Sequence, residues 1–190
     1  FAGTEARLAA VPLDLTAAEG RWRYAGGVLT IDDAAFRLTD RAIDARFQPL
    51  MAQGASLVLA NGRITANAML REPASGHDVV RAAIVHDLGS GRGSAALTVP
   101  GIVFDQAVQP VTLTRLALGV IANARGTVRG SGRIDWTPDT VTSTGSFGTE
   151  GLDFAAAFGP VRGVSGTVRF TDLLGLVTAP DQRLRIAEIN

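Results

Sequence analysis

Residues 57–71 read Leu-Val-Leu-Ala-Asn-Gly-Arg-Ile-Thr-Ala-Asn-Ala-Met-Leu-Arg, and they carry the clearest structural signal in the chain. Asn61-Gly62 is the preferred dipeptide of a two-residue type I′ turn, so the flanking segments are predicted to pair as an antiparallel hairpin. The predicted partners are Ala60 and Arg63, Leu59 and Ile64, and Leu57 and Ala66. One face of the hairpin then carries Leu57, Leu59, Ile64, Ala66, Ala68 and Leu70. The other face of the second strand is polar except for Met69, which is typical of a sheet with one apolar side.

A second turn, at Gly26-Gly27, gives the same result independently. It places aromatic and aliphatic residues on one face, with Trp22 opposite Ile31 and Tyr24 opposite Leu29. The other face is charged or polar, with Arg21 opposite Asp32 and Arg23 opposite Thr30. Cross-strand pairs of these kinds stabilise a sheet.

The second half of the chain shows the same alternation. Between residues 126 and 136, polar residues at odd positions alternate with Val128, Gly130, Gly132, Ile134 and Trp136. A later strand alternates Gly166, Val168 and Phe170 with polar residues. The tetrapeptide Gly-Thr-Val-Arg occurs at 126–129 and at 166–169, which is consistent with an internal repeat. Because period-two alternation recurs with glycine-rich turns, the fold class is predicted to be mainly β, as an antiparallel sheet.

Helical spacing is found in one segment after Pro110. Its apolar residues predict a helix over about 113–123 that packs the stripe Leu113, Leu116, Val120 and Ile121 against the sheet. A second short helix is predicted near 153–158, before Gly159-Pro160.

Composition excludes several classes of function. Eighteen basic residues, all of them Arg and scattered singly, balance eighteen acidic ones. A nucleic-acid partner is therefore not expected, since phosphate tracking needs clustered positive charge. The absence of Cys excludes disulfides, thiolate metal sites and cysteine nucleophiles. The longest apolar run, residues 116–122, is far shorter than the roughly 20 residues of a membrane-spanning helix. The first residues contain no targeting segment, so we expect the chain to be part of a longer protein.

Catalytic and metal-binding patterns are not found. The two His-Asp dipeptides, His77-Asp78 and His86-Asp87, flank a predicted strand and would lie roughly 25 Å apart, so they are interpreted as polar residues at strand ends. Residues 89–94 are rich in Gly and Ser but precede a strand rather than a helix, which indicates a hairpin connection and not a phosphate loop. Ser146, Thr149 and Ser165 have no His in a suitable pattern. The sequence therefore predicts no enzyme, no cofactor and no metal.

One stretch resembles a known family. Residues 110–136 contain a predicted helix that runs into the glycine-rich strand Gly126-Thr-Val-Arg-Gly-Ser-Gly-Arg-Ile-Asp-Trp136, and 163–170 repeat that strand. This region is similar to the C-terminal part of AsmA-like proteins, in the YdbH-like branch, with TamB as a more distant relative. Residues 1–109 match that family only in style.

The resemblance implies a periplasm-spanning, inner-membrane-anchored protein of Gram-negative bacteria. Its repeating strands would curl into an apolar groove, a β-taco or incomplete barrel with one or two short helices, that moves phospholipid between the membranes and supports outer-membrane integrity. We expect residues 1–109 to form β-hairpin repeats of this groove. Residues 110–190 would add a helix and glycine-rich β repeats, continuous with the first part. The expected partners are a phospholipid or another acyl-chain ligand, and membranes through other parts of a longer chain.

The predicted groove lining combines the apolar faces of the strands described above. It consists of Trp22, Tyr24, Leu29, Ile31, Leu57, Leu59, Ile64, Ala66, Val128, Ile134, Trp136, Val168 and Phe170. Two other interpretations remain. In the first, the chain is a structural exported β-domain, such as an adhesin-like solenoid, whose apolar face is filled by its own side chains. In the second, it is a small-acid binding protein, since this branch has also carried a dicarboxylate-transport label.

Overall fold

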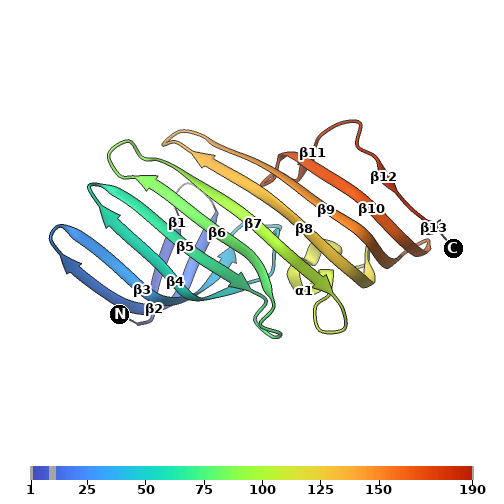
Figure 1. Cartoon of the computed structure of the whole chain (residues 1–190), viewed down its shortest axis with the longest axis horizontal. Coiled ribbons are helices and arrows are strands. Elements are labelled where there is room, and N and C mark those ends of the chain that lie inside the picture. Colours follow the sequence, from blue (N-terminus) through green and yellow to red (C-terminus); the bar gives the residue numbers. More distant parts are fainter. Residues whose placement is uncertain (1, 9–11, 190) are drawn as a thin grey trace.

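A single antiparallel sheet makes up most of the computed structural model, which describes residues 2–8 and 12–189 (Figure 1). Its long strands are β2 (Leu13–Ala25), β3 (Val28–Asp40), β4 (Leu50–Ala60), β5 (Arg63–Arg71), β6 (Asp78–Asp87), β7 (Arg92–Phe104), β8 (Ala122–Trp136), β9 (Val141–Ala156) and β10 (Gly159–Asp172). Short strands lie at the edges, namely β1 (Thr4–Leu8), β11 (Val177–Thr178), β12 (Leu184–Arg185) and β13 (Glu188–Ile189). The mainly β, antiparallel fold class is therefore confirmed.

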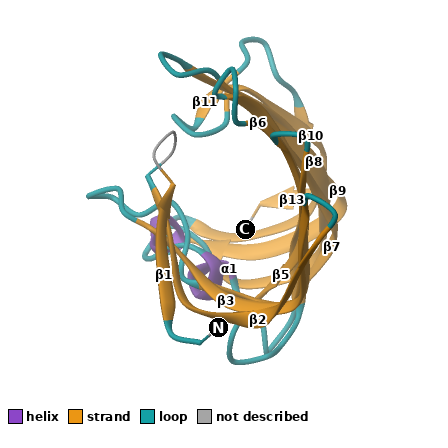
Figure 2. Ribbon diagram, turned by 90° about the vertical axis from the view of Figure 1, so that its left-hand side faces the viewer, coloured by secondary structure: helices purple, strands orange, loops and turns teal. Residues whose placement is uncertain are grey.

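Every strand from β1 to β10 pairs with the strand that follows it in sequence, and β12 and β13 also pair with β10. Among the described residues, the two ends of this path do not pair with each other, so the sheet is open. Figure 2 shows that it curls strongly when viewed along the long axis of the molecule. The strands therefore curve around a groove that runs along the direction of strand stacking.

Both predicted hairpins are confirmed. Trp22 pairs with Ile31 and Tyr24 with Leu29, while Leu59 pairs with Ile64 and Leu57 with Ala66. The turn residues Gly26, Gly27, Asn61 and Gly62 all have positive φ, between 50° and 80°. Two successive left-handed residues are the requirement of a type I′ turn, which explains why these dipeptides fixed the register.

Bulges bend the first long strands without changing which residues face inward. Ala17, Asp33 and Gly54 have φ of 51°, 51° and 69°, and each lies where the register of β2, β3 or β4 shifts. A bulge adds one residue to a strand and increases its local bend. The apolar positions consequently change from Leu57 and Ala55 to Ala52 and Leu50 along β4 while staying on one side of the sheet.

The two predicted helices are wrong in extent or in kind. In place of a helix over 113–123, the chain forms the single turn α1 (Pro110–Leu113), a 3₁₀ turn η1 (Arg115–Ala117) and then β8 from Ala122. Thr114 is extended between the two turns and caps η1 with its hydroxyl, and Leu116 and Val120 are 47% and 58% exposed. Residues 153–158 belong largely to β9, because Phe154 and Ala156 pair with Val161 and Gly159 of β10. Strand pairing overrides local helical spacing at 153–156, whereas in 113–123 the extended Thr114 interrupts the helix and only residues 122–123 enter a strand.

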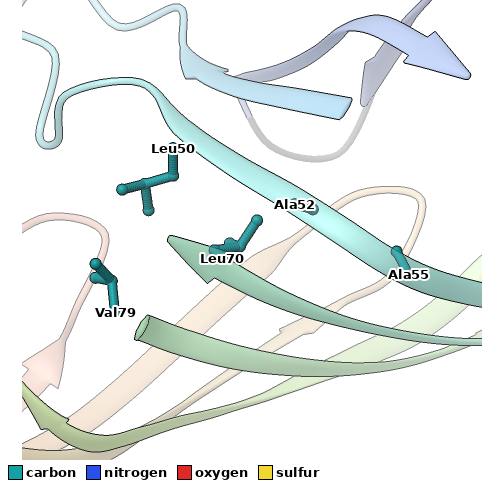
Figure 3. Packing of buried hydrophobic residues seen from close by; sticks show 5 residues of the cluster. All are labelled: Leu50, Ala52, Ala55, Leu70 and Val79. Carbon is teal, nitrogen blue, oxygen red and sulfur yellow. The ribbon is translucent and has the colours of Figure 1, made fainter. Parts of the chain in front are cut away.

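The most buried cluster lies near the N-terminal end of β4. Figure 3 shows its five members, Leu50, Ala52, Ala55, Leu70 and Val79, on β4, β5 and β6. Phe47 from the β3–β4 loop and Leu113 from α1 pack against this cluster. The backbone N–H of Gln48 donates to the carbonyl of Leu113 at 2.7 Å. This corner is therefore a small closed core, with α1 as its cover.

Candidate functional site

Cross-strand pairing collects the apolar residues on one face of the sheet, which we call the inner face. One row across the strands is Tyr24, Leu29, Leu59, Ile64, His86, Gly93, Trp136 and Val141. The next row is Trp22, Ile31, Leu57, Ala66, Ile84, Ala95, Ile134 and Ser143. Val128, Val168 and Phe170 follow in phase on β8 and β10. All thirteen residues of the predicted lining thus lie on this one face.

The inner face is the concave one, because segments that cover it from opposite ends of the sheet meet each other. Phe47 in the β3–β4 loop packs on the N-terminal strands, and a Cβ added to Gly132 or Gly145 would touch Leu173 of the β10–β11 turn. Arg46 Nη1 of the first segment donates to the carbonyl of Leu174 in the second at 3.4 Å. The β3–β4 loop and the β10–β11 turn are attached far apart along the sheet. They can touch only if the face between them curls inward.

The opposite face of the sheet, the outer face, is polar and solvated. Along β5 the exposed residues Arg63, Thr65 and Asn67 alternate with the half-buried Ile64 and Ala66. Ion pairs on exposed side chains join Arg133 to Asp135 at 2.7 Å and Arg21 to Asp33. Such pairs contribute little to stability, but they keep the arginines of these strands away from the inner face.

The inner face is covered unevenly. Trp22 and Tyr24 are 61% and 66% exposed, whereas Ile134 is only 8% exposed. The remaining residues of the predicted lining are partly buried. Over β8–β10, large side chains fill the space above glycines, so that a Cβ added to Gly130 would lie 2.4 Å from the ring of Phe147. Phe147 also contacts Phe170 edge to face. Within the predicted lining, the surface is thus most exposed at Trp22 and Tyr24 on β2.

A histidine also belongs to the inner face, although it is not among the residues of the predicted lining. His86 pairs with Ile64 and Gly93 in the first inner row, and its Nδ1 accepts a hydrogen bond from Trp136 Nε1 at 3.1 Å. It was interpreted as a polar residue at a strand end. The alternation Ala82, Ile84, His86 along β6 is the signal that would have placed it inside.

Polar side chains fix the two segments that meet over the groove. The side chain of Asp40 is fully buried and accepts from Arg46 Nε at 2.7 Å and Nη2 at 2.9 Å, and from two backbone N–H groups. Burial alone would raise the pKa of Asp40, but these hydrogen bonds outweigh it and hold the pKa below its usual 3.8. At the other segment, Ser143 Oγ donates to Asp172 Oδ1 at 2.6 Å and accepts from the N–H of Leu174 at 2.9 Å. The hydrogen bond from Ser143, followed by that from Gly175 N–H, lowers the pKa of Asp172.

Within residues 2–8 and 12–189, no group of three or more His, Asp or Glu side chains is arranged to hold a metal ion. The two His-Asp dipeptides lie at opposite ends of β6, as predicted. No helix in the described part of the chain is long and apolar enough to cross a membrane.

These features define a class of protein, an open antiparallel sheet whose concave face is apolar and whose convex face is polar. The chain belongs to the YdbH-like family, described as intermembrane phospholipid transport protein YdbH, because the model of that family matches residues 1–190. This assignment confirms the resemblance found in the sequence and identifies the chain as part of a non-catalytic lipid transport family. Comparison with curated proteins and with solved structures gave no match.

Proposed function

We propose that the inner face shields the acyl chains of a phospholipid while the lipid crosses the periplasm between the inner and outer membranes. The observation that carries this proposal is the continuity of the inner rows. From β2 to β9 the two rows contain no carboxylate and no guanidinium group. An unpaired charge would be very costly beside hydrocarbon, so the arrangement suits an acyl chain.

The energetic need for such a surface is large. Burying a methylene is worth about 0.8 kcal/mol, so exposing a sixteen-carbon chain to water would cost on the order of 10 kcal/mol. A carrier therefore has to cover the chain throughout its path. We further propose that residues 1–109 and 110–190 contribute successive parts of one groove, within a longer, inner-membrane-anchored protein that supports outer-membrane integrity.

A second candidate function is a structural β-domain whose concave face is filled by its own side chains. The covered surface over β8–β10, with Phe147 lying over Gly130 and Ile134 buried, favours this alternative. The exposed Trp22 and Tyr24 on β2 favour the groove. The two candidates differ in what a charge placed on β5 would do.

Ile64→Asp tests the proposal, with Thr65→Asp as a control one residue away on the outer face. Ile64 is half-buried on the inner face and Thr65 is exposed. In an open groove the new carboxylate reaches water, so we expect Ile64→Asp to fold like the parent but to lose crosslinking to a phospholipid with a photoactivatable acyl chain. Thr65→Asp should retain both properties.

Thermal unfolding and crosslinking are measured on the same samples. If Ile64→Asp unfolds while Thr65→Asp stays native, the inner face at β5 is ordinary core and the structural domain is the better account. If the parent, Ile64→Asp and Thr65→Asp all crosslink equally, the groove does not hold the acyl chain.

A further inference from the structure

The rim of the groove carries a polar group that the proposed function leaves unused. The inner row that contains Tyr24, Ile64, His86 and Trp136 lies within three residues of the hairpin turns that end these strands. Because the strands curve around the groove, strand ends form its rims (Figure 2). An acyl chain held inside would bring the polar part of its lipid to such a rim.

His86 is held in place by a residue two strands away. Trp136 on β8 reaches across β7 to His86 on β6, with ring centroids 6.0 Å apart and planes at 29°. Gly93 on β7 leaves the space for this crossing, since a Cβ there would lie 2.4 Å from the Trp136 ring. The pair is therefore built from three adjacent strands rather than from a flexible loop.

The hydrogen bond to Trp136 also sets the chemistry of His86. An indole N–H only donates, so Nδ1 of His86 is the acceptor. In the neutral imidazole the proton then resides on Nε2. Among the described residues, His86 Nε2 has no hydrogen-bond partner, which leaves one oriented N–H donor in a row whose other polar side chains are Tyr24 and Trp136.

Charge at the same rim favours an anion. Arg63 of β5 and Arg92 of β7 flank Asp87 of β6 in the register. Asp87 faces outward and already accepts from both the hydroxyl and the N–H of Ser90, each at 2.7 Å. Arg63 and Arg92 lie on the outer face with Asp87, so two guanidinium groups and one occupied carboxylate stand behind the inner row at this rim.

We propose that His86, oriented by Trp136, binds a phosphate oxygen of the phospholipid headgroup at the rim of the groove. This inference rests on the proposed function, because it places the headgroup by the position of the acyl chain. A phosphodiester cannot follow the chain inward without losing its hydration. His86 offers an N–H donor at the edge of the apolar surface, fixed in direction by Trp136.

The test compares two ligands with the same photoactivatable acyl chain, phosphatidylethanolamine and diacylglycerol, which lacks the phosphate. We expect the parent to crosslink the phospholipid more than the diacylglycerol. His86→Phe keeps an aromatic ring but loses the N–H donor. It should reduce the ratio of phospholipid to diacylglycerol crosslinking about tenfold, because a hydrogen bond to a charged group is lost. His86→Gln can accept from Trp136 and still donate, so it should restore most of the ratio. A merely structural His86 would change thermal stability without changing this ratio.

NMR of the imidazole nitrogens identifies the source of the phosphate. The chain contains two histidines, so His77, which is exposed on the β5–β6 turn, serves as internal reference. Phosphatidylethanolamine should shift His86 Nε2 and leave His77 unchanged, whereas inorganic phosphate at the same concentration should shift neither. Equal shifts of His86 with both would assign the site to free phosphate and overturn the headgroup assignment. If the parent binds both lipids but the ratio is the same in His86→Phe, the headgroup inference fails alone; if the parent binds neither lipid, the proposed function fails.

Discussion

Replacement of Arg46 by Met should destabilise the protein by about 3 kcal/mol at pH 7. The side chain of Asp40 is 0% exposed and that of Arg46 is 15% exposed, so the change leaves a carboxylate buried without its cation. Removing one partner of a buried ion pair costs roughly 3–5 kcal/mol. The lower value applies because the backbone N–H groups of Ala42 and Arg46 still donate to Asp40. For a chain of this length the loss corresponds to a decrease in Tm of roughly 6–12 °C.

The loss of stability in Arg46→Met should also depend on pH. Because the folded-state pKa of Asp40 lies below its ordinary value, the carboxylate stabilises the fold fully above the unfolded-state pKa of about 3.9. This contribution is lost as the pH falls through the folded-state pKa. Urea unfolding of Arg46→Met, followed by tryptophan fluorescence at pH 7 and pH 3, measures the difference. Arg37→Met, which removes an exposed arginine from β3, the strand that ends at Asp40, is the control and should change stability by less than about 0.5 kcal/mol. A deficit below about 1 kcal/mol at pH 7, or one equally large at pH 3, would refute the reasoning.

Two further changes test the packing of the inner face. Gly93→Ala should lower the free energy of unfolding by roughly 1–3 kcal/mol through overpacking and should alter the fluorescence of Trp136. The reason is that the added Cβ meets both the Trp136 ring and the carbonyl of Val85. Unchanged Trp136 emission would contradict the crossing of β7 by this side chain. Leu70→Ala removes a side chain that is 6% exposed in the closed core and should cost roughly 2–5 kcal/mol in urea unfolding, whereas Ala68→Gly on the same strand would be expected to cost less.

Local chemistry explains which parts of the fold could be predicted. The turns at Gly26-Gly27 and Asn61-Gly62 set the register through their backbone conformation, and the register then placed Trp22, Leu59 and their neighbours on one face. The predicted helix over 113–123 is wrong because Thr114 is extended between α1 and η1 and because residues 122–123 belong to β8, which pairs with strands on both sides. The contact between Arg46 and Leu174 joins residues 128 positions apart. It depends on the curvature of the whole sheet, which no short pattern encodes.

The order of the strands has a consequence for how such a protein can grow. Since each long strand pairs with its neighbours in sequence, a chain that folds from its N-terminus can add strands one at a time, without waiting for a distant segment. Duplication of one hairpin would lengthen the structure by about 10 Å, two strand spacings, while existing strand pairs keep their partners. In this architecture, changing the number of hairpins would therefore change the length of the sheet.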